Sequence, residues 1–302
     1  MRILGYRSQR TLAAPVQIAG VGFITGAEVR VTLLPAAPDT GLVFRRIDRP
    51  GSPTIRAAVS SVTSTQRRTT LGPPDCGITL VEHILAALFG LRIDNCWIEL
   101  HGPEPPGLDG SALGFVQAMC AVGAVRQAAR RPIYTVREPV LVRSGGATLA
   151  VHPAAGLECV ATYRLDYGWG APLAPQTHTL RISPGEFARE LAPCRTFLTE
   201  SEVQALRQSG IGLHLGPADL LVFGAQGPIG NRVRFADEPA RHKILDMIGD
   251  LALCGFDIAG HIIGYRSGHA LNVELASRLV ELAHGKLRRI PRRVESPRCH
   301  AA

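Results

Sequence analysis

An internal repeat constrains the fold of this 302-residue chain more than any other feature of its sequence. Each half contains, in the same predicted order, a helix, a glycine, an apolar strand, a loop and a second helix that opens with Gly-x-Ala-Leu. The two openings are Gly110-Ser111-Ala112-Leu113 and Gly268-His269-Ala270-Leu271, and the preceding helices align through His83-Ile84-Leu85-Ala86 and Lys243-Ile244-Leu245-Asp246. The repeat predicts two similar α+β units, and two such units facing each other would bring their first helices together.

The length favours two domains, at about 150 residues per domain, and hydrophobic periodicity predicts the elements of each half. In the first half we predict strands over 16–18, 28–34, 42–47 and 95–100, and helices over 79–90 and 109–122, the latter capped by Asp109. In the second half we predict strands over 135–142, 147–152 and 158–163, and helices over 183–186, over 200–207 and from Asp237 onward. We interpret the arginine-rich stretch 126–134 as a linker, which divides the chain into domains 1–130 and 131–302.

The helix that begins near Asp237 carries three polar residues at a spacing that places them on one face. Asp237 is a suitable N-cap, Pro239 fits the first turn, and an apolar stripe follows. His242, Asp246 and Asp250 are separated by four residues each and therefore share one side of the helix. They could include metal ligands, or they could form a solvated face with an incidental His–Asp pair.

The corresponding helix of the first half offers Glu82 and His83. Thr79 and Glu82 have the spacing of a capping box, so Glu82 could simply satisfy the start of its helix. The functional interpretation is that His83 binds a metal and Glu82 activates the metal's water. Because position 87 is alanine, this helix provides one strong ligand, and further ligands must come from elsewhere, such as His242 and Asp246.

Two imidazoles and one carboxylate suit a catalytic zinc ion, Zn2+, with one position open for water. Zinc lowers the pKa of such a water from 15.7 to about 7, and Glu82 could take its proton as it attacks a carbonyl. Thr196 could donate a hydrogen bond to the developing oxyanion. His269 lies at a predicted helix N-terminus, which disfavours its protonation, whereas a carboxylate such as Asp250 would favour it. These parts together predict metal-assisted hydrolysis of an amide or ester.

Composition limits the other function classes. The formal charge is +8, and much of it comes from a basic tail, in which the positive residues are Lys286, Arg288, Arg289, Arg292, Arg293 and Arg298. Aromatic residues are few and no DNA-binding motif is present, so we expect no nucleic-acid partner. The seven cysteines are odd in number and contain no CxxC pair, which argues against a disulfide framework. With no signal peptide and no apolar run long enough for a bilayer, a cytoplasmic protein without a transmembrane segment is expected.

Taken together, these residues resemble a known family over nearly the whole chain, from about Gln9 to Glu281. The chain is similar to the zinc-dependent UDP-3-O-acyl-N-acetylglucosamine deacetylases, which catalyse the committed step of lipid A biosynthesis. The matching stretches are Gln9-Arg10-Thr11-Leu12, Gly20-Val21-Gly22, Thr69-Thr70-Leu71-Gly72, Val81-Glu82-His83, Asp109-Gly110-Ser111-Ala112, Arg195-Thr196-Phe197, Arg241-His242-Lys243-Ile244-Leu245-Asp246 and Ser267-Gly268-His269-Ala270-Leu271-Asn272.

The resemblance implies a role for each candidate residue. Zinc would be bound by His83, His242 and Asp246, with Glu82 as the general base. The resemblance further implies that His269, held by Asp250, is the cationic acid, that Thr196 contacts the oxyanion, and that Phe197 and Lys243 contact the nucleotide-sugar. It implies an insert at about 199–222 that forms an apolar passage for the acyl chain, and a fold in which the helices are sandwiched between the sheets of the two α+β domains.

Two other functions remain open at this stage. A zinc hydrolase of the same fold could act on another N-acyl sugar or amide, and a non-catalytic protein could use its positive charge to bind anions. A protein that only binds would not need the full set of candidate catalytic residues, so we favour the enzyme, and we expect a monomer. Familiar family members carry Gly-Gly-Ser where this chain has Leu215-Gly216-Pro217, so the sequence does not predict the length of the acyl chain.

Overall fold

The protein is described by a computed structural model that covers residues 1–285, so the predicted basic tail lies outside the described residues. The first half contains a five-stranded sheet in the order β2-β3-β8-β4-β5, in which only β4 and β8 are parallel. Its strands are β2 (Val16–Val21), β3 (Glu28–Pro35), β4 (Leu42–Arg46), β5 (Thr54–Arg56) and β8 (Cys96–His101). In β3 the buried Val29, Val31 and Leu33 alternate with more exposed residues, as expected for a strand with one face on the core.

The second half contains a sheet of the same topology, in the order β10-β11-β18-β12-β13 with only β12 and β18 parallel. Its strands are β10 (Val140–Ser144), β11 (Ala147–Pro153), β12 (Cys159–Leu165), β13 (Gln176–Arg181) and β18 (Gly260–Tyr265). In both sheets the last strand in the chain follows a helix and inserts between the second and third strands. The repeat seen in the sequence is therefore a duplication of topology.

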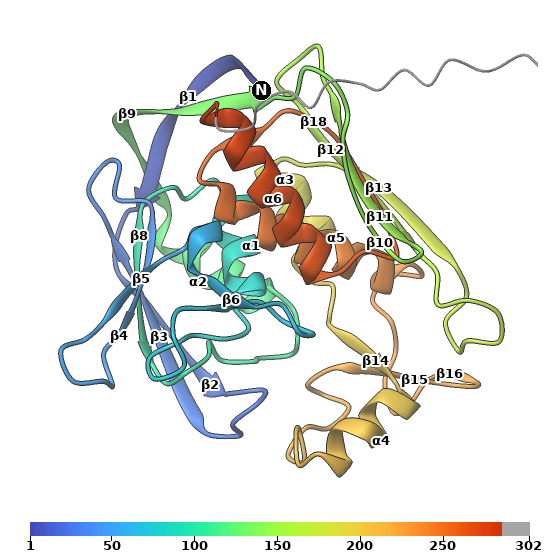
Figure 1. The fold of residues 1–302 in the computed structure, drawn as a ribbon. Helices are drawn as coiled ribbons and strands as arrows, with labels where there is room; N and C mark the ends of the chain where they lie inside the picture. Colours follow the sequence, from blue (N-terminus) through green and yellow to red (C-terminus); the bar gives the residue numbers. More distant parts are fainter. Residues whose placement is uncertain (286–302) are drawn as a thin grey trace, which may run out of the picture.

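Four helices lie between the two sheets (Figure 1). They are α1 (Glu82–Gly90), α2 (Leu113–Val122), α5 (Glu238–Leu251) and α6 (His269–Ala283). Residues 84–88 of α1 are all fully buried, and most of α5 is buried as well, because each helix is covered on nearly all sides by the sheets and the other helices. This arrangement confirms the predicted α+β fold with helices sandwiched between two sheets.

The two central helices, α1 and α5, approach each other at Gly249. A Cβ atom added at Gly249 would lie 2.1 Å from the backbone oxygen of Glu82, far closer than any side chain tolerates. A glycine at this position therefore allows the backbones to come into direct contact. The contact lies at the start of α1, next to His83, so it fixes the first helix of one half against that of the other.

A third sheet connects the two halves and corrects one prediction. It consists of β1 (Arg2–Leu12), β9 (Ala124–Thr135) and β17 (Asp257–Ile258), with β9 in the centre. The stretch 126–134, interpreted as a linker, is thus the body of a long strand that pairs antiparallel with β1. The boundary predicted at residue 130 falls inside this strand, and the division into 1–130 and 131–302 stays a prediction.

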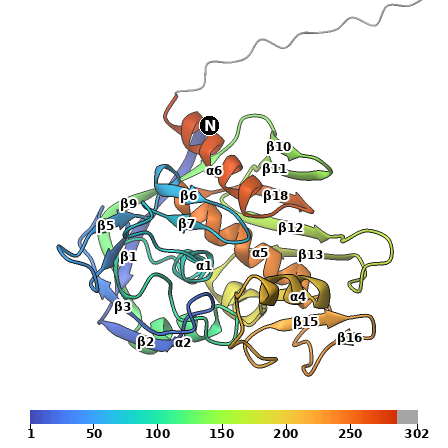
Figure 2. The ribbon, with the colours of Figure 1, turned by 60° about the horizontal axis from the view of Figure 1, so that its bottom comes forward.

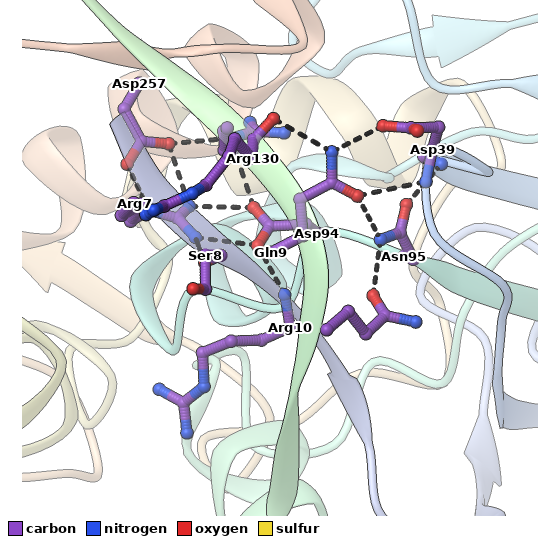
Figure 3. A network of polar contacts seen from close by, with 12 residues as sticks. Arg7, Ser8, Gln9, Arg10, Asp39, Asp94, Asn95, Arg130 and Asp257 are labelled. Atoms are coloured by element: carbon purple, nitrogen blue, oxygen red, sulfur yellow. Dashed lines mark hydrogen bonds and ion pairs between the residues drawn. The ribbon is translucent and has the colours of Figure 1, made fainter. Parts of the chain in front are cut away.

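Charged residues on this third sheet join the two halves (Figure 3). Arg7 of β1 and Arg131 of β9 are register partners, and both contact Asp94, which precedes β8, and Asp257, which precedes β18. Arg7 donates to both oxygens of Asp94 at 2.7 Å, and Arg131 Nε lies 2.7 Å from Asp257. Burial alone would raise the pKa of Asp257, but the two arginines lower it overall. We call these four residues the interdomain clasp.

The predicted insert forms a small separate unit beside the helices (Figure 2). It contains β14 (Phe197–Thr199), α4 (Glu200–Gln208), β15 (Leu221–Gly224) and β16 (Gly227–Pro228). The helix α4 begins with a capping box in which Thr199 and Glu202 satisfy each other's backbone N–H groups. The remaining elements are β6 (Val62–Ser64), β7 (Thr70–Leu71), α3 (Pro184–Glu186), the 3-10 turns Val59–Ser61 and Ala252–Cys254, and a π-helical turn at Phe187–Leu191.

Two predicted helix caps differ in the structure. Asp237 is the N-cap residue of α5, as predicted, but its side chain makes no hydrogen bond to the helix backbone, because its carboxylate binds Arg241 and His178. Asp109 accepts hydrogen bonds from Ser111 in the turn before α2, which itself begins at Leu113. In both cases an ionic or turn contact replaces the expected bond to the helix backbone. Within residues 1–285, none of the helices combines the length and apolar character needed to cross a bilayer.

Candidate metal centre and catalytic site

His83 from α1 and His242 and Asp246 from α5 converge on one point. One ligand atom of each residue lies within 4.8 Å of the ligand atoms of the other two. The Nε2 atoms of His242 and His83 lie 3.2 Å and 3.5 Å from Asp246 Oδ1, and the two rings meet edge to face with centroids 5.0 Å apart. The duplication thus brings together the three residues that the sequence predicted as metal ligands.

The protonation of these residues fits a bound cation. The Nδ1–H of His242 donates to the Cys194 carbonyl at 3.0 Å, so a neutral ring presents a lone pair on Nε2 toward Asp246. Burial lowers the pKa of His242 to about 4, which keeps the ring neutral. Asp246 Oδ1 is buried and has no hydrogen-bond partner among residues 1–285. His242 Nε2 and Asp246 Oδ1 thus face each other with a lone pair each and no hydrogen between them. A cation would satisfy both atoms, so the three side chains could hold a metal ion.

Lys243 and Asp246 form a largely buried ion pair beside this group. Lys243 Nζ lies 2.8 Å from Asp246 Oδ2, the oxygen that faces away from the histidines. Burial alone would raise the pKa of Asp246, but the positive charge of Lys243 beside it helps to lower that pKa well below its ordinary value. The carboxylate is therefore charged, as a metal ligand must be. Lys243, predicted to contact a nucleotide-sugar, lines the cavity described below while also neutralising one oxygen of Asp246.

Glu82 lies at the first position of α1, and the capping-box alternative for it is wrong. Val81 is the N-cap residue, with no side-chain cap, while Thr79 Oγ1 accepts from Arg68. The Glu82 carboxylate instead accepts the backbone N–H of Thr69 at 3.1 Å. Glu82 is buried, and this burial raises its pKa. A buried carboxylate with a raised pKa next to a metal group has the properties of a general base.

His269 begins α6, and Asp250 of α5 fixes its orientation. The Nδ1–H of His269 donates to Asp250 Oδ2 at 2.8 Å, which also accepts from Asn272 at 2.9 Å. Burial alone would lower the pKa of His269, but Asp250 and Glu82 raise it to about 9. The ring is therefore cationic at neutral pH. Its Nε2 atom lies 3.9 Å from Glu82 Oε1, which leaves a gap longer than a hydrogen bond between the acid and the base.

Thr196 and Phe197 lie at the junction of the insert with the second half. The backbone N–H of Thr196 donates to Gly110 at 2.7 Å, and the buried pair of Arg195 and Glu238 anchors the preceding residue. Gly110 has φ +79°, and a Cβ there would lie 2.4 Å from the insert backbone, so a glycine is required. The Phe197 ring packs edge to face against His242 with centroids 6.1 Å apart. Both residues line the cavity beside the metal group.

That cavity has a volume of about 640 Å3 and combines the predicted site residues with an apolar wall. Its polar part includes His83, His242, Lys243 and His269. Its apolar part includes Leu198, Leu206, Ile211, Leu215 and Leu220 of the insert, and Phe23 and Ile24 of the first half. A smaller cavity of about 240 Å3 inside the insert shares the five insert residues just named. The insert therefore continues the apolar surface away from the metal group.

Sequence reasoning missed several residues of this site. Thr69, Asn272 and the Cys194 carbonyl contact Glu82, Asp250 and His242, but no periodicity or spacing pointed to them. Thr69 and Asn272 lie in two of the stretches that carry the family resemblance, which is the one signal that could have indicated them. Tyr167, which packs against Phe197 and lines the cavity, follows a strand in an otherwise unremarked loop.

Comparisons with known proteins agree with this geometry. Residues 9–281 match the family model described as LpxC: UDP-3-O-acyl N-acetylglycosamine deacetylase. A UDP-3-O-acyl-N-acetylglucosamine deacetylase of Thermosynechococcus vestitus is 41% identical over 275 residues, which cover 91% of this chain and 94% of that protein. One from a Nostoc species is 37% identical over 288 residues, covering 91% and 99%. A bifunctional LpxC/FabZ enzyme of Chlorobaculum tepidum is 37% identical over 91% of this chain and 64% of its own length. The matched segment contains every residue of the site.

Proposed function

The chain belongs to the UDP-3-O-acyl N-acetylglycosamine deacetylase family, and we propose that it hydrolyses the N-acetyl group of UDP-3-O-acyl-N-acetylglucosamine to give UDP-3-O-acyl-glucosamine and acetate. It is a deacetylase, a hydrolase that acts on an amide bond, in a family of lipid A biosynthesis. The observation that carries the proposal is the buried, unpartnered Asp246 Oδ1 between two histidines, with Glu82 and His269 at its side.

We propose that the ion is Zn2+, held by His83, His242 and Asp246. Two neutral imidazoles, one carboxylate and an open position are typical of catalytic zinc sites. When bound, such an ion would acidify a water molecule and polarise the acetamide carbonyl. The contribution of the protein is to keep His242 neutral and Asp246 charged, which the Cys194 carbonyl and Lys243 support.

The proton transfers in this proposal belong to Glu82 and His269. Glu82 takes a proton from the attacking water, and its burial favours a base strong enough for that step. His269, charged because of Asp250, stabilises the negative oxygen that develops and then protonates the leaving amine. Thr196 contributes a hydrogen bond to the same oxygen. The gap of 3.9 Å between His269 and Glu82 keeps each group available to the substrate.

Substrate binding is assigned to the large cavity. Lys243 would contact the nucleotide-sugar through its charge and Phe197 through its ring, both from the cavity wall. The acyl chain would lie along Leu198, Leu206 and Leu215 of the insert, since these residues line both the large cavity and the smaller one inside the insert. Burial of an acyl chain against such a surface is favourable by about 0.8 kcal/mol for each CH2 group.

We further propose that the protein is a cytoplasmic monomer. The six cysteines among residues 1–285 are all free, as is usual in a reducing compartment. Sedimentation of the purified protein at several concentrations tests the monomer, and a mass that rises with concentration would contradict it.

The function is tested by measuring acetate release from UDP-3-O-acyl-N-acetylglucosamine before chelation, after chelation and after addition of zinc. We expect release that chelation abolishes and zinc restores. The variant His83→Ala should lose both the bound metal and the activity, while Cys120→Ala, an exposed residue outside the site, should retain them. Stoichiometric zinc without acetate release across several acyl lengths would instead favour a hydrolase for another N-acyl sugar or amide.

A further inference from the structure

Thr69 contacts both the candidate base and the carboxylate that orients the candidate acid. It lies in the loop before β7 and is fully buried. Its backbone N–H donates to Glu82 Oε2 at 3.1 Å, and its hydroxyl donates to Asp250 Oδ1 at 2.5 Å. Glu82 belongs to the first half and Asp250 to the second. One residue therefore connects the two groups across the interface between the halves.

The hydroxyl of Thr69 completes the set of donors around Asp250. One oxygen of that carboxylate accepts from Thr69, and the other accepts from His269 and Asn272. The Thr69 oxygen also lies 3.4 Å from His269 Nδ1, on the side of the ring that faces Asp250. Because both oxygens are occupied, the carboxylate cannot turn without breaking a hydrogen bond. The orientation of the His269 ring therefore depends on Thr69.

The gap between His269 and Glu82 makes this orientation important. His269 Nε2 lies 3.9 Å from Glu82 Oε1, and a cationic ring and a carboxylate at that distance attract each other. If His269 and Glu82 came within hydrogen-bonding distance, they would bind each other, and neither could exchange a proton with a substrate. Thr69 opposes this closure from both ends, because it binds Glu82 through its backbone and Asp250 through its side chain.

We propose that Thr69 is a positioning residue that holds Glu82 and His269 apart in the reactive geometry. The expected effect of Thr69 on kcat rests on the proposed deacetylase function, whereas its expected effect on the distance between His269 and Glu82 does not. Thr69 touches no reacting atom in this proposal. It acts by fixing the carboxylate of Asp250 and the carboxylate of Glu82 relative to each other.

Thr69→Val is the sharpest test, because valine keeps the shape and the backbone N–H and removes only the hydroxyl. We expect kcat to fall by about 10–100-fold, the loss typical of residues that orient an active group, with KM and metal content close to those of the parent protein. Thr69→Ser keeps the hydroxyl and should restore most of kcat. Thr70→Val is the matched control, since the Thr70 hydroxyl pairs with Thr79 and not with the site.

A crystal structure of Thr69→Val with metal bound tests the geometry without any substrate. We expect His269 and Glu82 to close to about 3.2 Å or less, the range of a hydrogen bond. An unchanged gap, a normal kcat in Thr69→Val, or a Thr69→Ser variant as slow as the valine variant would each overturn the proposal. If the valine variant does not fold, Thr69→Ala is judged by the same criteria. A parent protein that binds metal but releases no acetate would refute the proposed function. The distance between His269 and Glu82 in the Thr69→Val crystal structure would then still decide whether Thr69 holds the two groups apart.

Discussion

Replacing Gly249 by alanine should disturb the metal centre without touching any of its ligands. The added Cβ would meet the Glu82 carbonyl oxygen at 2.1 Å, whereas real Cβ atoms stay at least 3.0 Å from such atoms, so α1 and α5 must separate by about 0.9 Å. Metal sites tolerate changes of only about 0.2 Å in ligand distances. Because His83 lies on α1 and the other two ligands lie on α5, this separation acts directly on the ligand set.

Two effects follow from that displacement. Overpacking of this kind costs about 1–3 kcal/mol, partly offset by the better helix propensity of alanine, which is worth about 1 kcal/mol. The melting temperature should therefore fall by a few degrees, since 1 kcal/mol corresponds to roughly 2–4 °C in chains of about 200 residues. Metal affinity should fall more clearly, by at least the factor of about 10–100 seen when groups that support metal ligands are replaced.

Competition with a chromophoric chelator measures the affinity, and calorimetry measures the melting temperature. Gly185→Ala is the control, because a Cβ at that helical position meets nothing within 4 Å. A Gly249→Ala protein with the metal affinity and melting temperature of the parent would show that the contact between α1 and α5 does not position the ligands.

Three further changes test the site and the clasp. Glu82→Gln should keep metal and lower kcat by about 100–10,000-fold, the usual cost of losing a general base, and near-normal turnover would remove Glu82 from that role. The pKa of His269 is raised from 6.5 to about 9, so the cationic ring persists below pH 9 and kcat/KM should fall as the pH rises through about 9. The pH profile of His269→Gln should lack this decline. A variant with the same decline as the parent protein would contradict the assignment of His269 as the acid. Arg131→Ala removes one partner of two largely buried carboxylates and should lower the free energy of unfolding by about 1–3 kcal/mol in urea titrations. Arg181→Ala, whose ion pair is exposed and screened by solvent, should lower it clearly less, and equal losses would show that the clasp contributes no more than a surface ion pair.

The sequence predicted the parts of the fold whose residues repeat locally. Strand alternation, the apolar helices and the repeated Gly-x-Ala-Leu were sufficient for two facing α+β units, and hence for the convergence of His83, His242 and Asp246. The strand β9 was missed because its arginines and small alanines leave most of its sequence without the apolar–polar alternation of a half-buried strand. Its partner β1 lies at the other end of the first half, and a pairing over that distance leaves no local pattern.

The candidate site likewise contains residues that local spacing predicts and residues that only the tertiary structure brings in. Residues spaced along one helix, such as His242, Asp246 and Asp250, share a face by helical geometry, and a spacing argument can find them. Thr69 enters the site from a loop, and its contacts with Glu82 and Asp250 depend on tertiary structure alone. The same holds for the capping-box alternative at Glu82. Its sequence spacing was correct, but burial near Thr69 and His269 gave the carboxylate other partners.

The duplicated fold also explains why residues 1–285 contain one candidate metal group and not two. The alignment of the repeats sets His83 opposite Lys243 and Ala86 opposite Asp246, so equivalent positions carry different chemistry in the two halves. Ala86 is fully buried, and a carboxylate there would add an unpaired charge to the interior, which is strongly unfavourable. In the proposed roles, the first half therefore supplies the base and one metal ligand, and the second supplies two metal ligands and the cationic histidine. Neither half can form this group of residues alone, so the backbone contact at Gly249 and the interdomain clasp support the proposed catalytic site.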